Sequence, residues 1–156
     1  MDLDLELVAL SDAPALLALS TIEWLATAKS ALKEIGYKVH TASNHEDFVV
    51  RFGRVQYQVV ILEELFAANT VEENLSLQFL QQQSMNRRRH AVSIFIANDA
   101  QTLNPMQAFQ ASVHAVINPT ELGQLQPIVQ QVVANHDRFM KSYRDAETRL
   151  ANAAAV

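Results

Sequence analysis

Three residues with chemically useful side chains each follow a short, mostly apolar run: Ser20, Glu63 and Asn118. If these runs are parallel strands, the side chains after them meet at one edge of a sheet, where α/β proteins usually bind ligands. A carboxylate at that edge is the kind of group that holds Mg²⁺ or accepts a phosphoryl group. The neighbouring residues complete a candidate crevice, which is lined by Ser20, Thr21, Glu63, Glu64, Ala97, Asn98 and Asn118.

The composition excludes several other kinds of chemistry. There is no Cys among the 156 residues, which excludes disulfides, iron–sulfur clusters and thiolate nucleophiles. The isolated Gly36, Gly53 and Gly123 form neither a phosphate loop nor a dinucleotide fingerprint, and no Gly-x-Ser-x-Gly turn is present. The five His residues, at 40, 45, 90, 114 and 136, show no metal-ligand spacing. We therefore expect no enzyme activity, no cofactor and no metal.

Charge and length limit the size of the fold and the kind of partner. With 12 Lys and Arg against 17 Asp and Glu, the formal net charge is −5, which repels nucleic acid and anionic membranes at long range. The start of the chain is acidic where a signal peptide would be basic, and no apolar run reaches the roughly 18 residues that span a bilayer. We expect one cytoplasmic domain over residues 1–156 whose partners are proteins, with no nucleic acid and no membrane.

Apolar runs alternate with longer amphipathic stretches, a pattern typical of an α/β fold with helices on both faces of a parallel sheet. The expected strands are Ala15–Leu19, Tyr37–Thr41, Gln58–Leu62, Ser93–Ala97 and His114–Ile117. Helices are expected at 22–35 with Gly36 as the left-handed cap, at 44–52, from Thr70 onward, and at 105–112. Thr70 and Glu73 form a capping-box pattern, and Asn104 followed by Pro105 is a helix start.

Two segments extend beyond these five strands. Residues 2–7 alternate acidic and apolar side chains, which predicts an extra edge strand within 1–13, paired either within the chain or with a second copy. After the last strand, a heptad seam with spacing 4-3-4-3-4-3-4 predicts a long helix that extends over 134–156. We expect this helix to form a homodimer or to pack on a larger assembly. The seam consists of Leu125, Val129, Val132, His136, Phe139, Tyr143, Ala146 and Leu150.

Three stretches of the chain carry a family resemblance. ALKEIGYKVHTASNHEDF, YQVVILEEL and the Asn-Pro pair in HAVINP resemble the receiver domains of two-component response regulators, over about residues 15–133. The resemblance implies a doubly wound, flavodoxin-like sheet of five parallel strands in the order 2-1-3-4-5. In this family, an acidic pair ends the first strand, the phosphorylated Asp ends the third, a Thr or Ser follows the fourth, and Lys-Pro follows the fifth.

This chain departs from the family at each position of the phosphorylation site. The degenerate pocket has Leu19 and Ser20 at the acidic pair, Glu63 at the phosphorylated Asp, Ala97 at the hydroxyl residue and Asn118 at the Lys. The aromatic residue that rotates between states in the family is also replaced, by an alanine. Phosphoryl transfer to a carboxylate needs a metal ion, a well-placed acceptor and donors for the developing charge. We therefore expect the pocket to bind neither Mg²⁺ nor a phosphoryl group.

Two alternatives concern the same pocket. A register with Ser11 and Asp12 at the end of the first strand would restore one carboxylate, but we reject it because it puts Pro14 in the way. Glu63 has two interpretations, either a fixed charge that imitates a phosphorylated acceptor or a surface carboxylate in an inactive site. The second is favoured, because one carboxylate carries less charge than an acyl phosphate and lacks its three oxygens.

The run Arg87-Arg88-Arg89-His90 is the one dense basic cluster. Cations at a helix C-terminus complement the helix dipole, which is the favoured interpretation, and docking of an acidic protein partner is the alternative.

The function predicted from the sequence is that of a pseudo-receiver, a non-catalytic adaptor that binds proteins independently of phosphorylation. A structural subunit of a larger cytoplasmic assembly is the alternative hypothesis, and a phosphorylatable response regulator is the third.

Overall fold

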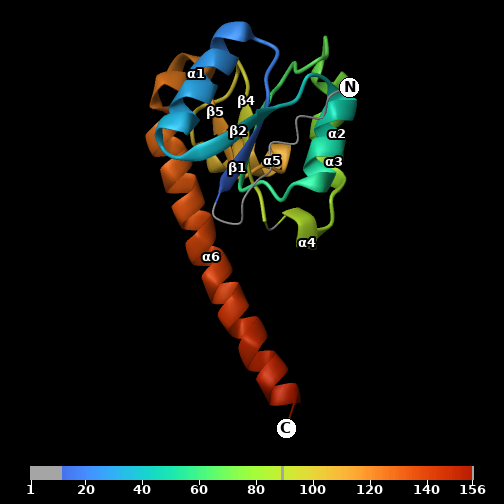
Figure 1. The fold of residues 1–156 in the computed structure, drawn as a ribbon, viewed down its shortest axis with the longest axis vertical. Coiled ribbons are helices and arrows are strands. Elements are labelled where there is room, and N and C mark those ends of the chain that lie inside the picture. The colour runs from blue at the N-terminus through green and yellow to red at the C-terminus, as the bar shows by residue number, and fades with distance from the viewer. Residues whose placement is uncertain (1–11, 89, 156) are drawn as a thin grey trace.

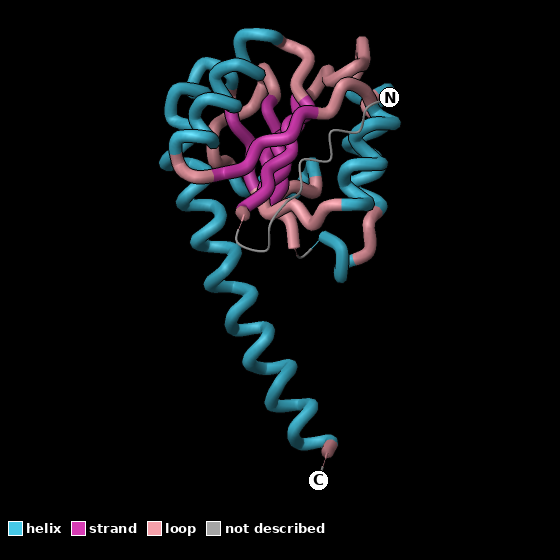
Figure 2. The backbone as a smooth tube through the Cα atoms, in the orientation of Figure 1, coloured by secondary structure: helices cyan, strands magenta, loops and turns pink. Residues whose placement is uncertain are grey.

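The computed structural model describes residues 12–88 and 90–155, in which helices cover both faces of a five-stranded parallel sheet (Figures 1 and 2). The strand order β2-β1-β3-β4-β5 confirms the predicted fold class and order. The strands are β1 Ala13–Ala18, β2 Tyr37–Thr41, β3 Val59–Glu63, β4 Val92–Ile96 and β5 Ala115–Ile117. The helices are α1 Ile22–Glu34, α2 His45–Arg54, α3 Leu75–Gln82, α4 Met85–Arg88, α5 Pro105–Ala111 and α6 Leu125–Ala154, with 3-10 turns η1 Val71–Glu73 and η2 Pro119–Gln124. The predicted extra strand at residues 2–7 lies outside the described residues.

Alternate residues of the central strands divide the core between the two faces of the sheet. Leu17 of β1 and Ile61 of β3 are register partners, and both belong to the apolar cluster that includes residues of α1 and α6. Leu16 and Val60, the adjacent partners, belong to the opposite cluster with residues of α2, α3 and α5. All five residues of β3 are buried, as expected for a strand covered on both faces.

The helix ends follow the predicted signals at two places. Gly36 follows α1 with φ +94°, and its N–H donates to the carbonyl oxygen of Lys33 at 3.1 Å. The Oδ1 of Asn104 accepts hydrogen bonds from the second and third residues of α5, and Pro105 is the first. The first strand begins two residues earlier than predicted, at Ala13. Because Pro14 lies inside β1 and Asp12 precedes it, the register with Asp12 at the strand's carboxyl end is excluded.

The third helix begins at Leu75 and not at Thr70, so the predicted capping box is wrong. The Thr70 side chain makes no cap hydrogen bond, and the Glu73 carboxylate accepts from the backbone N–H of the residue before Thr70. Only a 3-10 turn forms there. The Oδ1 of Asn74 caps α3 instead, accepting from the N–H of Leu77 at 3.1 Å. Asn74 is the cap because its side-chain amide also donates hydrogen bonds to the carbonyl oxygens of Glu63 and Glu64 at the end of β3, which hold it in position.

Helix α6 contains 30 residues, which corresponds to about 45 Å at 1.5 Å per residue, and confirms the predicted long C-terminal helix. Its first turns pack on the sheet, and the remaining turns run past the end of the domain (Figure 1). In the described part of the chain, no helix is both long and apolar enough to cross a membrane.

Candidate functional site

The five residues of the predicted pocket lie at the same end of the sheet, because β1, β3, β4 and β5 are parallel and their carboxyl ends share one edge. Glu63 is the last residue of β3, while Ala97 and Asn118 directly follow β4 and β5. Leu19 and Ser20 directly follow β1. The sequence therefore predicted correctly that these residues lie at the carboxyl ends of the strands, with strand ends shifted by one residue, and the structure adds what their side chains do.

The Glu63 carboxylate is a buried structural group. The residue is only 4% exposed, and its Oε1 accepts a hydrogen bond from the backbone N–H of Thr21 at 3.0 Å. Thr21 is the N-cap residue of α1, and its own side chain makes no cap hydrogen bond. Backbone N–H groups at a helix start need acceptors, and a negative charge is favourable there. The interpretation of Glu63 as a surface carboxylate is thus corrected, since the side chain tethers β3 to the start of α1 from below the surface.

The residues after β1 are also engaged within the domain. Leu19 is buried in the apolar cluster under α1 and α6. The Oγ of Ser20 accepts a hydrogen bond from the N–H of Ala67 at 2.9 Å. Ala67 has φ +46°, a left-handed conformation that is unfavourable for a residue with a Cβ. The Ser20 hydroxyl therefore helps to hold the strained loop that follows β3.

The Asn118 side chain occupies the place of the family's Lys, and its amide is fully used. Nδ2 donates to the carbonyl oxygens of Asn98 at 3.1 Å and Ala100 at 2.9 Å. Oδ1 accepts from both the N–H and the hydroxyl of Thr120, at 3.0 and 2.7 Å. Asn118 thus closes the loop after β4 onto the start of η2. Ala97 beside it offers only a methyl group, which packs on the second apolar cluster.

This donor set does not fit a magnesium ion. Mg²⁺ takes oxygen ligands in octahedral geometry, normally from a carboxylate cluster. Here the acidic-pair positions hold a buried leucine and a serine already bonded to the loop, and Glu63 caps a helix. No group of three or more His, Cys, Asp or Glu side chains among the described residues is arranged to hold a metal ion.

A fully buried asparagine, Asn74, supports the same edge of the sheet, and its role could not be recognised from the sequence, where it is only a polar residue near a helix start. The Nδ2 of Asn74 donates to the carbonyl oxygens of Glu63 and Glu64, both at 3.0 Å. Its Oδ1 caps α3. One side chain thus connects the carboxyl end of β3 to the start of α3.

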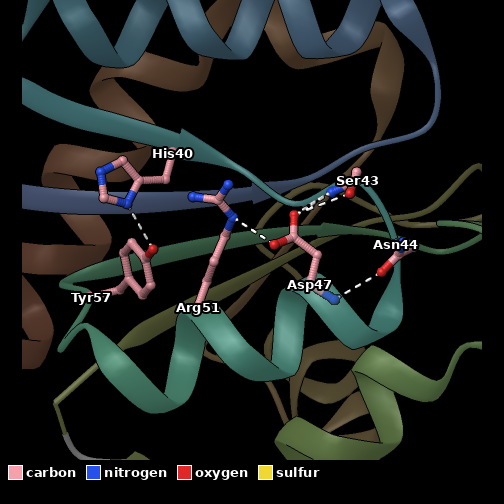
Figure 3. Close-up of polar contacts among 6 residues, drawn as sticks. All are labelled: His40, Ser43, Asn44, Asp47, Arg51 and Tyr57. Atoms are coloured by element: carbon pink, nitrogen blue, oxygen red, sulfur yellow. Dashed lines mark hydrogen bonds and ion pairs between the residues drawn. The ribbon is translucent and has the colours of Figure 1, made fainter. Parts of the chain in front are cut away.

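A second polar network, also missed from the sequence, lies around α2, β2 and the loop before β3 (Figure 3). Asp47 Oδ2 accepts from the Ser43 N–H at 2.9 Å, and Oδ1 pairs with Arg51 Nε at 2.9 Å. The Tyr57 hydroxyl lies 2.8 Å from His40 Nδ1, and burial is the main cause that raises the pKa of Tyr57 to about 12. The i, i+4 spacing of Asp47 and Arg51 is the signal that could have revealed half of this network.

Replacing Asp47 by Ala is expected to lower the free energy of unfolding by about 1–2 kcal/mol at neutral pH. Burial alone would raise the pKa of Asp47, but the Ser43 backbone and Arg51 outweigh it and hold that pKa below its ordinary 3.8. A lowered folded-state pKa gives stability that is present above 3.8 and is lost as the pH falls through the folded value. The deficit of Asp47→Ala should therefore shrink in urea denaturation series below about pH 4. The exposed Asp145→Ala variant is the control, and an equal deficit there would contradict the assignment.

The heptad seam of α6 divides between the core and the surface. Leu125 and Val129 are fully buried in the domain's own core, and Val132 packs against it. The side chains of Leu125 and Val129 are therefore not available to a partner, in contrast to the prediction from the heptad pattern. Phe139 and Leu150 are 70% and 72% exposed.

The middle of the seam borders a groove of about 830 Å³ between α6, α5, α4 and β5. Phe109 on α5 is 80% exposed and lines the groove together with Phe139. Its lining includes Phe109, Val113, Val132, Phe139, Met140 and Tyr143. A concave, mostly apolar surface of this size is typical of an interaction site.

His136, the polar member of the seam, packs against the domain. Its ring meets the ring of His114 edge-on, with centroids 4.7 Å apart. His114 Nδ1 accepts from the Ser93 N–H at 3.0 Å. Although part of His114 is exposed, desolvation of its ring and then the neighbouring His136 and Arg88 lower its pKa.

The comparisons with known proteins agree with this fold. No protein-family model and no curated protein matches the chain. The chain is similar to the CheY-like receiver domain from Methanospirillum hungatei, with TM-score 0.63 and 15% identity, over 82% of this chain and 98% of that one. It is similar to the receiver domain of a Pseudomonas aeruginosa sensor histidine kinase, which holds a magnesium ion in its active-site cleft, with TM-score 0.61, 18% identity and 80% and 99% coverage.

A third solved structure, which contains a trimeric coiled coil of yeast Spc42 fused to another structure, matches with TM-score 0.59 and 15% identity over 96% of this chain and 100% of that one. The likenesses to the two receiver domains define a receiver-type fold and confirm the resemblance found in the sequence.

Proposed function

We propose that the protein is a pseudo-receiver, a module with the receiver fold that binds other proteins without being phosphorylated. The observation that carries the proposal is the burial of Glu63 and its hydrogen bond to the Thr21 N–H. An acceptor carboxylate must reach a phosphodonor and a metal ion, whereas this one is 4% exposed and serves as a helix cap. The burial of Glu63 also argues against the hypothesis that its carboxylate permanently imitates a phosphorylated acceptor, because such a negative charge would need to lie at the surface.

The remaining pocket residues support the same proposal. The side chains of Ser20 and Asn118 form hydrogen bonds with loop residues of the domain, and Leu19 belongs to its core. In the similar Pseudomonas aeruginosa domain the corresponding cleft holds magnesium. The hydrogen bonds that Ser20, Glu63 and Asn118 make within the domain favour a structural role for this edge over group transfer.

The partner surface that we propose is the distal half of α6 with the groove beside it, and the first partner is a second copy of the chain. Phe139 and Leu150 lie on one heptad seam, and large exposed apolar side chains at this spacing favour pairing with a like helix.

Treatment with acetyl phosphate and Mg²⁺, followed by intact-mass spectrometry, tests phosphorylation independence. We expect no covalent addition and no magnesium uptake by calorimetry, because the pocket lacks both a metal-binding carboxylate cluster and an accessible acceptor. A receiver domain with a complete acidic pocket, treated in parallel, is the positive control. A phosphoryl adduct mapped to Glu63 or Glu64 would overturn the proposal.

A further inference from the structure

A second cavity, of about 240 Å³, lies at the opposite end of the sheet from the degenerate pocket, where β3 and β4 begin. One wall comes from the end of α2 and the loop into β3, and the other from α4 and the loop into β4. Figure 1 shows α4 at the end of the sheet where β1 starts. The cavity is lined by Phe52, Gly53, Arg54, Val55, Gln56, Tyr57, Arg87, His90 and Ala91.

The charged side chains in the lining of this cavity are the two guanidinium groups of Arg54 and Arg87. Arg54, Arg87 and His90 are exposed, come from separate segments, and share the lining with no Asp or Glu. Two guanidinium groups converging on one cavity repel each other, and the chain as a whole has a net charge of −5. The positive cavity is therefore a local feature and not a reflection of the overall charge.

Neighbouring arginines on the same two helices show what a purely structural arginine does here. Arg51 on α2 pairs with Asp47 at 2.9 Å, and Arg88 on α4 donates to the Ser112 carbonyl oxygen at 2.7 Å. Within the described residues, Arg54 and Arg87 form no ion pair and no side-chain hydrogen bond. In both α2 and α4, one arginine therefore forms a contact within the fold, and a second arginine lines the cavity.

We propose that this cavity binds carboxylate side chains from an acidic segment of a partner protein. Guanidinium groups bind carboxylates through paired, charge-assisted hydrogen bonds, and Arg is favoured at protein interfaces. The apolar lining from Phe52, Val55 and Ala91 contacts the aliphatic part of such side chains. A volume of about 240 Å³ is smaller than the roughly 300–1,000 Å³ of sites for drug-sized ligands, so it fits side chains better than a nucleotide.

This inference rests on the proposed function as a protein-binding module, and it adds the chemistry of one partner. It differs from nucleic-acid binding, which needs a wide basic face with aromatic groups on which bases stack. In this cavity, Tyr57 is almost fully buried and its hydroxyl is paired with His40. The ring of the half-buried Phe52 stacks on Phe48 and meets Phe79 edge-on, so both aromatic rings of the lining are engaged within the domain.

The test is fluorescence anisotropy with the full chain and a labelled octaglutamate peptide, at low and at raised ionic strength. We expect saturable binding that Arg54→Ala/Arg87→Ala weakens by at least about tenfold, because two charge-assisted contacts are lost. The control Arg138→Ala/Arg144→Ala removes the same charge from the exposed face of α6 and should leave the affinity unchanged. Circular dichroism should show both variants folded, because all four side chains are exposed.

Equal losses in the two double variants would overturn the proposal, since they would indicate a general charge effect. Tighter binding of a single-stranded DNA oligonucleotide with the same dependence on Arg54 and Arg87 would overturn the choice of an acidic peptide, as would full displacement of the peptide by millimolar inorganic phosphate. The assay contains no phosphodonor, so its failure leaves the outcome of the acetyl phosphate experiment unchanged and the two proposals fail separately.

Discussion

Replacing both Phe139 and Leu150 by Glu is expected to convert a dimer of the full chain into monomers. Both side chains are at least 70% exposed on the α6 seam, so burying them against a second copy drives association and charges there oppose it. Multi-angle light scattering should report a change from twice the chain mass of 17.4 kDa to that mass. Because neither side chain lies in the core, the thermal unfolding temperature of the domain itself should not be lowered by lost core packing.

The matched control adds the same charge to the other side of the helix. Gln130→Glu and Asn152→Glu are exposed α6 positions that lie off the seam. This variant should keep the mass of the unmodified chain. A monomeric unmodified chain at high micromolar concentration would refute the homodimer and leave α6 as a surface for another protein.

Replacing Asn74 by Ala is expected to lower the free energy of unfolding by about 3 kcal/mol, the largest stability effect of a single polar substitution predicted for this protein. The loss of the α3 cap costs about 1 kcal/mol. Each of the two carbonyl oxygens of Glu63 and Glu64 then loses its side-chain donor, at about 1 kcal/mol each. Since whole domains are stable by only about 5–15 kcal/mol, equilibrium denaturation in urea will resolve this change.

Asn69→Ala is the control for Asn74, because Asn69 is an exposed asparagine in the same loop. Its expected change is within about 0.5 kcal/mol. A loss at Asn74 no larger than at Asn69 would show that the three hydrogen bonds of Asn74 do not hold this edge together.

The strands and most helix ends could be predicted from the sequence because their signals are local. A strand buried on both faces is a continuous apolar run in the sequence, as in β3. The left-handed conformation of Gly36 and the start of α5 at Asn104-Pro105 depend on the conformational preferences of those residues themselves. The false start at Thr70 shows the limit of this reasoning. A capping box and a buried asparagine competed for one helix start, and contacts with β3 decided between them.

The roles of the site residues could not be predicted, because they depend on partners far away in the chain. Glu63 bonds to a backbone group 42 residues earlier, and Ser20 to one 47 residues later. The heptad seam has a different ambiguity. An apolar stripe looks the same whether it faces a sheet or a second helix, so Leu125 and Val129 could not be distinguished from Leu150 without the fold.

The tether between Glu63 and Thr21 bears on how a protein of this type could regain phosphate chemistry. An aspartate at position 63 is one methylene shorter, so it would pull back from the Thr21 N–H and leave the beginning of α1 without its acceptor. That single substitution weakens the fold and leaves Leu19 and Ser20, which carry no carboxylate, unchanged. Selection for a stable chain therefore favours keeping Glu63, because its replacement by aspartate costs stability.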